Sequence, residues 1–150
     1  MSTHIAKADA ISRHISLLLR RKVFVQPAAA PAKGKLVIFG RYEDGTGKAL
    51  GTVGADMALA AYAGAALSLV PADVARDCIR VRRLEPALQE NFGEILNVLC
   101  CGFDAEGGRV KLASMVFPPD AATDDFTGGL HLSLDIDGYG EGLLSLRSAA

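Results

Sequence analysis

Apolar and polar side chains alternate one by one along residues 130–137, LHLSLDID. Because successive side chains of a strand point to opposite faces, this period of two predicts a strand with one buried and one water-facing side. A glycine-rich turn at 138–142 then leads into a second extended segment at 143–147. The end of the chain is therefore predicted to form a β-hairpin.

The rest of the chain separates into helical and extended segments. Apolar residues at helical spacing, or in an unbroken run, predict helices over about 4–20, 57–70, 71–80 and 85–99. Extended patterns, two of them joined by a turn at Asp44-Gly45, predict strands over 22–25, 36–41, 49–53 and 110–117. This order favours an α+β fold, a mostly antiparallel sheet of about six strands packed with helices, because a doubly wound α/β fold would alternate the two. The length of 150 residues suits a single domain covering 1–150.

Composition excludes several classes of protein. Sixteen basic and seventeen acidic residues leave a formal net charge of -1, so no global charge favours nucleic acid. The apolar run at 57–70 falls short of the roughly 20 residues that a membrane-spanning helix needs. The cysteines, Cys78, Cys100 and Cys101, form neither a disulfide framework nor a CxxC metal motif, as expected for reduced thiols. We expect a cytoplasmic protein that neither binds nucleic acid nor inserts into a membrane.

Two segments resemble ligand-binding loops but lack essential residues. Gly45-Thr-Gly-Lys48 is followed by Ala49 where a phosphate loop needs a hydroxyl, and it is interpreted as a hairpin turn. Asp135-Ile-Asp137 resembles the start of a calcium loop, but Leu146 stands where the closing glutamate belongs. The three histidines share no metal-ligand spacing with one another or with the cysteines. No metal site is predicted.

The helix predicted at 85–99 carries the strongest candidate site. At roughly 100° per residue its apolar residues cover one broad arc, and Glu90, Glu94 and Asn97 fall together on the opposite side. Spacings of four and three residues stack these side chains on successive turns, where they can reach one common partner. A carboxylate can pair with a lysine of another molecule, and a carboxamide can orient water without titrating, which suits hydrolysis of an acyl phosphate. The alternative is an ordinary solvated helix face.

The pattern Glu90-x3-Glu94-x2-Asn97, followed by Pro118 and Pro119, resembles the active-site signature of the CheC/CheX/FliY phosphatases of bacterial chemotaxis. The order of predicted elements is similar to the CheX layout along nearly the whole chain. CheC members carry a second Glu-x2-Asn motif on the first helix, and the corresponding stretch here, AKADAISRHISLLL, has none. The resemblance therefore implies a single-site, CheX-like member with the α+β sandwich of that family.

This resemblance also implies roles for the three side chains. Asn97 is expected to enter the active site of a phosphorylated, CheY-like response regulator and orient the attacking water. Glu94 is expected to pair with the regulator's active-site lysine, and Glu90 to contact the same partner. The Mg²⁺ of the reaction would belong to the regulator, so the protein is expected to need no cofactor of its own. A homodimer is expected from the family alone.

The chain departs from the family pattern at several points. Glu90 stands where Asp or Ser is preferred, the two prolines come one or two residues early, and the glycine of the usual continuation is delayed to Gly102. Gly93 loosens the helix locally, at a cost of about 1 kcal/mol relative to alanine. Two alternatives therefore stay open: a CheX-like domain that binds a regulator without hydrolysis, and an unrelated domain with an enclosed apolar pocket between helices and sheet.

Overall fold

The computed structural model describes residues 2–105, 108–120 and 124–149. Its elements follow in the order α1 (Ser2–Leu19), β1 (Val23–Pro27), β2 (Ile38–Glu43), β3 (Ala49–Ala55), α2 (Met57–Leu67), α3 (Ala72–Val81), α4 (Pro86–Val98), the 3-10 turn η1 (Leu99–Gly102), β4 (Lys111–Val116), β5 (Leu130–Ile136) and β6 (Gly140–Ser148). Each predicted helix and strand is present with slightly shifted ends. β6 begins at Gly140 instead of 143, because Gly140 and Gly142 pair with Ile136 and Leu134 of β5.

The strands form one six-stranded sheet in the order β1-β5-β6-β3-β2-β4, and every neighbouring pair is antiparallel. The hairpins β2–β3 and β5–β6 meet through the pairing of β3 with β6, which joins residues far apart in the chain. β1 and β4 form the two edges. The predicted α+β class, a six-stranded antiparallel sheet with four helices, is confirmed.

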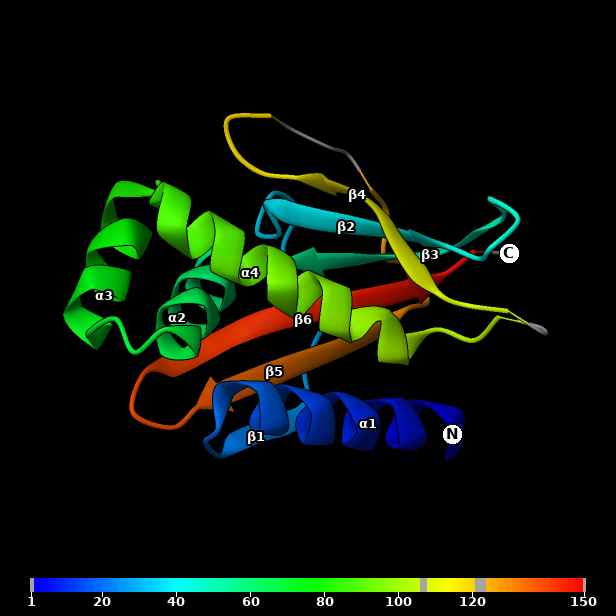
Figure 1. Cartoon of the computed structure of the whole chain (residues 1–150), viewed down its shortest axis with the longest axis horizontal. Helices are drawn as coiled ribbons and strands as arrows, with labels where there is room; N and C mark the ends of the chain where they lie inside the picture. The colour runs from blue at the N-terminus through cyan, green and yellow to red at the C-terminus, as the bar shows by residue number, and fades with distance from the viewer. Residues whose placement is uncertain (1, 106–107, 121–123, 150) are drawn as a thin grey trace.

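The helices cover one face of the sheet (Figure 1). α2 lies against β6, α4 packs on α2, and α1 runs beside β1. Between these layers lie the almost completely buried side chains of Ile15, Val53, Leu59, Phe92 and Leu144, one from each of five elements. In the part of the chain that the structure describes, no helix combines the length and the hydropathy needed to cross a membrane.

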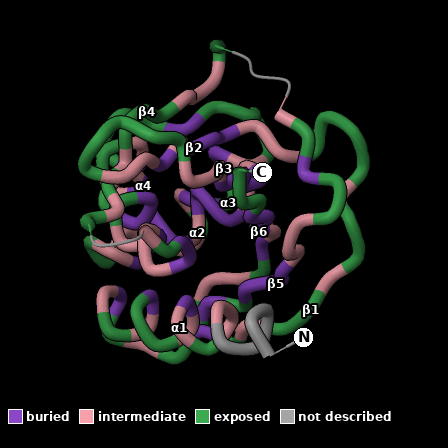
Figure 2. The backbone as a smooth tube through the Cα atoms, turned by 90° about the vertical axis from the view of Figure 1, so that its right-hand side faces the viewer, coloured by how far each residue is buried: buried purple, intermediate pink, exposed green. Residues whose placement is uncertain are grey.

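The other face of the sheet is covered in part by two connecting segments, residues 28–37 after β1 and residues 124–129 ahead of β5 (Figure 2). They reach the sheet at Gly54 of β3, where a Cβ atom would lie 2.8 Å from Cζ of Phe126 and 2.9 Å from Cδ1 of Leu36. The expectation of a water-facing side along β5 is therefore wrong in part: Ser133 is 7% exposed and His131 is half-buried. Local alternation predicts two faces, and segments distant in sequence decide which of them meets water.

Candidate functional site

The candidate residues Glu90, Glu94 and Asn97 lie on α4, and the opposite side of this helix is part of the hydrophobic core. Pro86 occupies the first turn, where its missing N–H group costs no hydrogen bond. Phe92, Ile95 and Leu96 are at most 2% exposed and hold the helix against the rest of the protein. Their burial determines which side of α4 faces outward.

A polar contact fixes the first half of α4 on α2. Nδ2 of Asn91 donates to the carbonyl oxygen of Gly64 at 2.8 Å and to the hydroxyl oxygen of Ser68 at 2.8 Å. The two helix backbones come close here, since a Cβ atom on Gly64 would lie 2.8 Å from the carbonyl oxygen of Leu88. The small residues of α2 thus allow the close packing that α4 requires.

The second half of α4 is tied to the sheet by Tyr42 of β2. Its buried hydroxyl group donates a hydrogen bond to the carbonyl oxygen of Leu96, the residue just before Asn97. Burial is the main cause that raises the pKa of Tyr42, so the phenol keeps its proton and stays a donor. The Tyr42 ring stacks on Phe103, with ring centroids 4.9 Å apart.

The structure places Glu90, Glu94 and Asn97 together on the outward side of α4, and all three are exposed. Within the described ranges, none of these side chains forms a hydrogen bond or an ion pair. Asn97 follows Glu90 by seven positions along the helix, so the row is about 10 Å long. Two carboxylates and one carboxamide are therefore free to bind groups of another molecule.

β4 lies beside α4, the helix that carries this row (Figure 1). Met115 is 46% exposed and packs next to Gly93, where a Cβ atom would lie 3.4 Å from its Sδ atom. Pro118 and Pro119, the prolines of the signature-like pattern noted in the sequence, follow β4 after one intervening residue. The sequence indicated only that Gly93 lowers the stability of the helix. In the structure its missing side chain leaves room for Met115 at the edge of the row.

The other motifs have structural roles. Oδ1 of Asp44 accepts from the backbone N–H groups of Thr46 and Lys48, at 2.8 and 3.0 Å, which closes the predicted hairpin turn. In the described part of the chain, no group of three His, Cys, Asp or Glu side chains is arranged to hold a metal ion. Burial raises the pKa of Cys101 to about 11, so at neutral pH this thiol is protonated and a poor nucleophile.

Sequence reasoning missed the residues that orient the row. Tyr42 carried a usable signal, because alternation along β2 places it on the same face as the buried Gly40 and Ile38. No local sequence pattern indicated Asn91 or Met115. The partner of Asn91 is on α2 and that of Met115 is on α4, and both partners are distant in sequence. The structure adds these three residues to the predicted set of Glu90, Glu94 and Asn97.

A six-stranded antiparallel sheet with helices on one face defines the class by its fold, which is shared by CheX, FliY and the FliM middle domain. No family model matches the chain, and no curated protein matches it. The resemblance inferred from the sequence is confirmed at the level of the fold.

Three solved structures illustrate the match. Chemotaxis protein CheX from Desulfovibrio desulfuricans is 16% identical, with a TM-score of 0.58 over 99% of this chain and 100% of that one. FliM from Helicobacter pylori, in its complex with SpeE, is 12% identical, with a TM-score of 0.59 over 97% and 83%. FliY from Thermotoga maritima is 11% identical, with a TM-score of 0.55 over 95% and 84%. At such identities the shared property is the fold.

Proposed function

We propose that the protein is a CheX-like phosphatase that hydrolyses the aspartyl phosphate of a CheY-type response regulator. The observation that carries this proposal is the exposed row of Glu90, Glu94 and Asn97 on α4. Hydrogen bonds of Asn91 and Tyr42 fix this helix against α2 and β2. Because these contacts anchor the helix, its backbone loses little conformational entropy when the row enters another protein's active site. The fold shared with CheX over the whole chain supports the same conclusion.

In this mechanism Asn97 orients the attacking water. Its Oδ1 accepts a hydrogen bond from the water, which directs a lone pair of the water oxygen toward phosphorus, in line with the bond to the aspartyl oxygen. The new P–O bond forms as the old one breaks, the aspartate carboxylate is regenerated, and the proton passes to the phosphate. Positioning supplies the acceleration, so Asn97 itself never needs to gain or lose a proton.

The two glutamates bind the regulator in this proposal. Glu94, one turn before Asn97, pairs with the regulator's active-site lysine and so places the amide beside the phosphoryl group. Glu90, a further turn away, contacts the same partner. Mg²⁺ bound to the regulator would neutralise charge on the phosphoryl oxygens, and this protein is expected to supply no cofactor of its own. A homodimer and a cytoplasmic location remain predictions.

The test is a phosphoryl-aspartate decay assay on the response regulators of the same cell, with Mg²⁺, in the presence and absence of the protein. Acceleration by the wild type and its loss in Asn97→Ala support the proposal. If Asn97→Ala accelerates decay as much as the wild type does, the role assigned to Asn97 is wrong.

A second function is a binding domain that docks through the same helix face without hydrolysis. The observation in its favour is that the same fold occurs in FliM, which has been solved in complexes with SpeE and with FliG. The departures of this chain from the signature, such as Glu90 at its first position, agree with that function. It predicts that the wild type binds a regulator, that Glu94→Lys weakens the binding, and that the phosphate lifetime stays unchanged.

A further inference from the structure

A cavity lies on the sheet face opposite the helices, away from the candidate site on α4. Here the two connecting segments at 28–37 and 124–129 leave between them a half-open cavity of about 500 Å³. This volume falls in the range that small-molecule sites occupy. It is not the enclosed pocket between helices and sheet that would have marked an unrelated ligand-binding domain.

The floor of the cavity includes Phe39 and His131, which belong to one row of paired residues across the sheet. Phe39, Gly54, Ser145 and His131 stand opposite one another on neighbouring strands β2, β3, β6 and β5, so they share the outer face. Because Gly54 has no side chain, the ring of Phe126 can lie on the sheet there. Phe126 stacks on Phe39, with ring centroids 6.2 Å apart and planes at 13°.

The walls of the cavity consist mainly of apolar side chains. Leu36 and Phe126 flank the floor, and the stretch Ala30-Pro31-Ala32 forms the side contributed by the first segment. Aromatic rings and small aliphatic groups arranged in this way favour a flat apolar ligand. The cavity therefore fits a ring-sized body better than a flexible polar chain.

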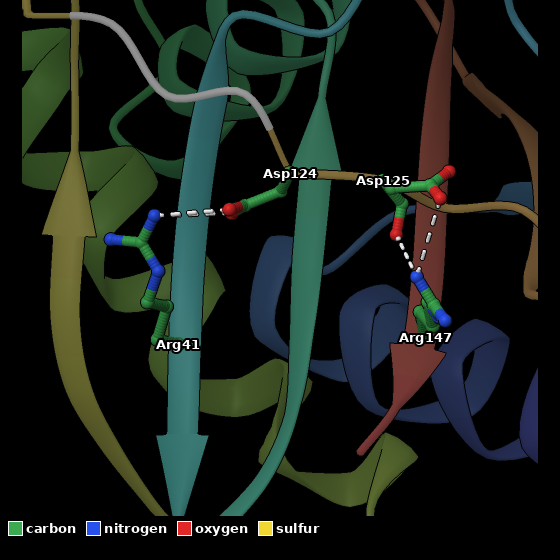
Figure 3. Close-up of polar contacts among 4 residues, drawn as sticks. All are labelled: Arg41, Asp124, Asp125 and Arg147. Carbon is green, nitrogen blue, oxygen red and sulfur yellow. Dashed lines mark hydrogen bonds and ion pairs between the residues drawn. The ribbon is translucent and has the colours of Figure 1, made fainter. Parts of the chain in front are cut away.

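The acidic residues at the cavity are already engaged by arginines (Figure 3). Asp124 pairs with Arg41 of β2 at 3.1 Å, and Asp125 pairs with Arg147 of β6 at 3.7 Å. Lys33 also lines the cavity, and within the described residues it has no ion pair. The uncompensated charge at the cavity is therefore positive.

One polar group remains on the floor. Nδ1 of His131 is hydrogen-bonded at 2.7 Å to the hydroxyl oxygen of Ser145, which is 1% exposed. That contact holds the imidazole in place and leaves Nε2 as its remaining polar atom. The cavity lining thus includes one imidazole, that of His131, and one lysine, Lys33, among mainly apolar residues.

From these observations we propose that the cavity binds a small aromatic carboxylate, with its ring against Phe39, Phe126 and Leu36 and its carboxylate at Nζ of Lys33. The opposite charge of Lys33 selects the anion, and the stacked rings select the aromatic body. This proposal is independent of the activity assigned to α4, because the cavity uses none of the residues of that helix.

The test is a titration of the ¹⁵N-labelled protein with 3-phenylpropionate, its uncharged amide and 3-phenylpropylamine, followed by amide chemical shifts. We expect the carboxylate to shift residues 28–37 and 124–131 but not α4, and to bind more tightly than the amide or the amine. Lys33→Gln is expected to weaken carboxylate binding about fivefold, the limit for an exposed ion pair, and to leave amide binding unchanged. Lys22→Gln, an exposed lysine outside the cavity, is the matched control.

Each other outcome overturns the proposal. Absence of shifts in the two segments would show that the cavity does not accept the ring. Equal binding of carboxylate and amide, or a carboxylate affinity that Lys33→Gln leaves intact, would remove the role of Lys33. Preference for the amine would show that Asp124 and Asp125 determine the charge of the site instead.

Discussion

Nδ2 of Asn91 donates to the carbonyl oxygen of Gly64 at 2.8 Å and so joins α4 to α2 one residue after Glu90. The contact lies beside the exposed row but is not part of it. A residue of this kind fixes the rotation of the helix about its axis, and with it the direction in which the row points. The orientation of the candidate site therefore depends on the packing of two helices.

Gly64→Ala is expected to destabilise the protein by about 1–3 kcal/mol, because the added methyl group would meet the backbone of Leu88 at 2.8 Å. The matched change is Gly93→Ala on α4, where the added methyl group would meet only the flexible end of Met115 at 3.4 Å. There the better helix propensity of alanine should stabilise by about 0.5–1 kcal/mol. Urea denaturation measures both, and opposite signs are expected. The same sign for both would contradict this account of the close helix contact.

Asn97→Ala is expected to lower the acceleration of phosphate loss about 100-fold, since a water that is no longer positioned attacks from many directions. Its free energy of unfolding should change by less than about 0.5 kcal/mol, because the side chain is exposed. Gln89→Ala removes another amide from the same helix, outside the row, and should keep the full rate. Equal losses in the two variants would show that the change acts through the helix and not through the water.

The pH dependence of stability should reveal the buried Asp56. It is 3% exposed, and burial raises the pKa of its carboxyl group above the ordinary value of 3.8, although Leu59 and Leu143 donate backbone hydrogen bonds to it. The folded protein thus holds this proton more tightly than the unfolded chain. The stabilisation from protonation is fully present below about pH 3.8 and is lost as the pH rises through the folded pKa.

Asp56→Asn keeps an oxygen acceptor for both N–H groups and cannot ionise. The variant should therefore gain stability relative to the wild type as the pH rises above about 4, and the difference should then level off. Asp44→Asn is the control of opposite sign, because hydrogen bonds from Thr46 lower the pKa of Asp44. The stabilisation from ionised Asp44 is present above about pH 3.8 and is lost below it. A stability difference for Asp56→Asn that does not vary with pH would contradict the prediction.

Gly54→Ala tests the contact that holds residues 124–129 on the sheet. The new methyl group would lie 2.8 Å from Cζ of Phe126, so the variant should lose about 1–3 kcal/mol of stability. Phe126→Ala alone should cost about 3 kcal/mol, as the loss of a buried ring does. In the double variant the clash with Phe126 is relieved and only the one with Leu36 remains, so the combined loss should be smaller than the sum. Additive losses in chemical denaturation would show that the two residues do not meet.

Much of the fold could be predicted because its signals are local. Alternation along 130–137 and helical spacing along 85–99 depend only on neighbouring residues, and both elements are present. The outward direction of Glu90, Glu94 and Asn97 also follows from helix geometry once the apolar side is buried. The partial burial of His131 on the polar side of β5 could not be predicted in this way, because the cavity that it lines is formed by residues of two separate connecting segments.

The sequence by itself determined the order of helices and strands, the α+β class and the row of polar side chains on α4, because periodicity is a property of adjacent residues. Only the tertiary structure decided which residues of other elements contact α4 and fix the orientation of that row. The contacts of Asn91 with Gly64 and of Tyr42 with Leu96 join residues 27 and 54 positions apart. Such contacts form when packing brings distant segments together, and no local pattern records them. The cavity between residues 28–37 and 124–129 arises in the same way, from two segments that meet only on the folded sheet.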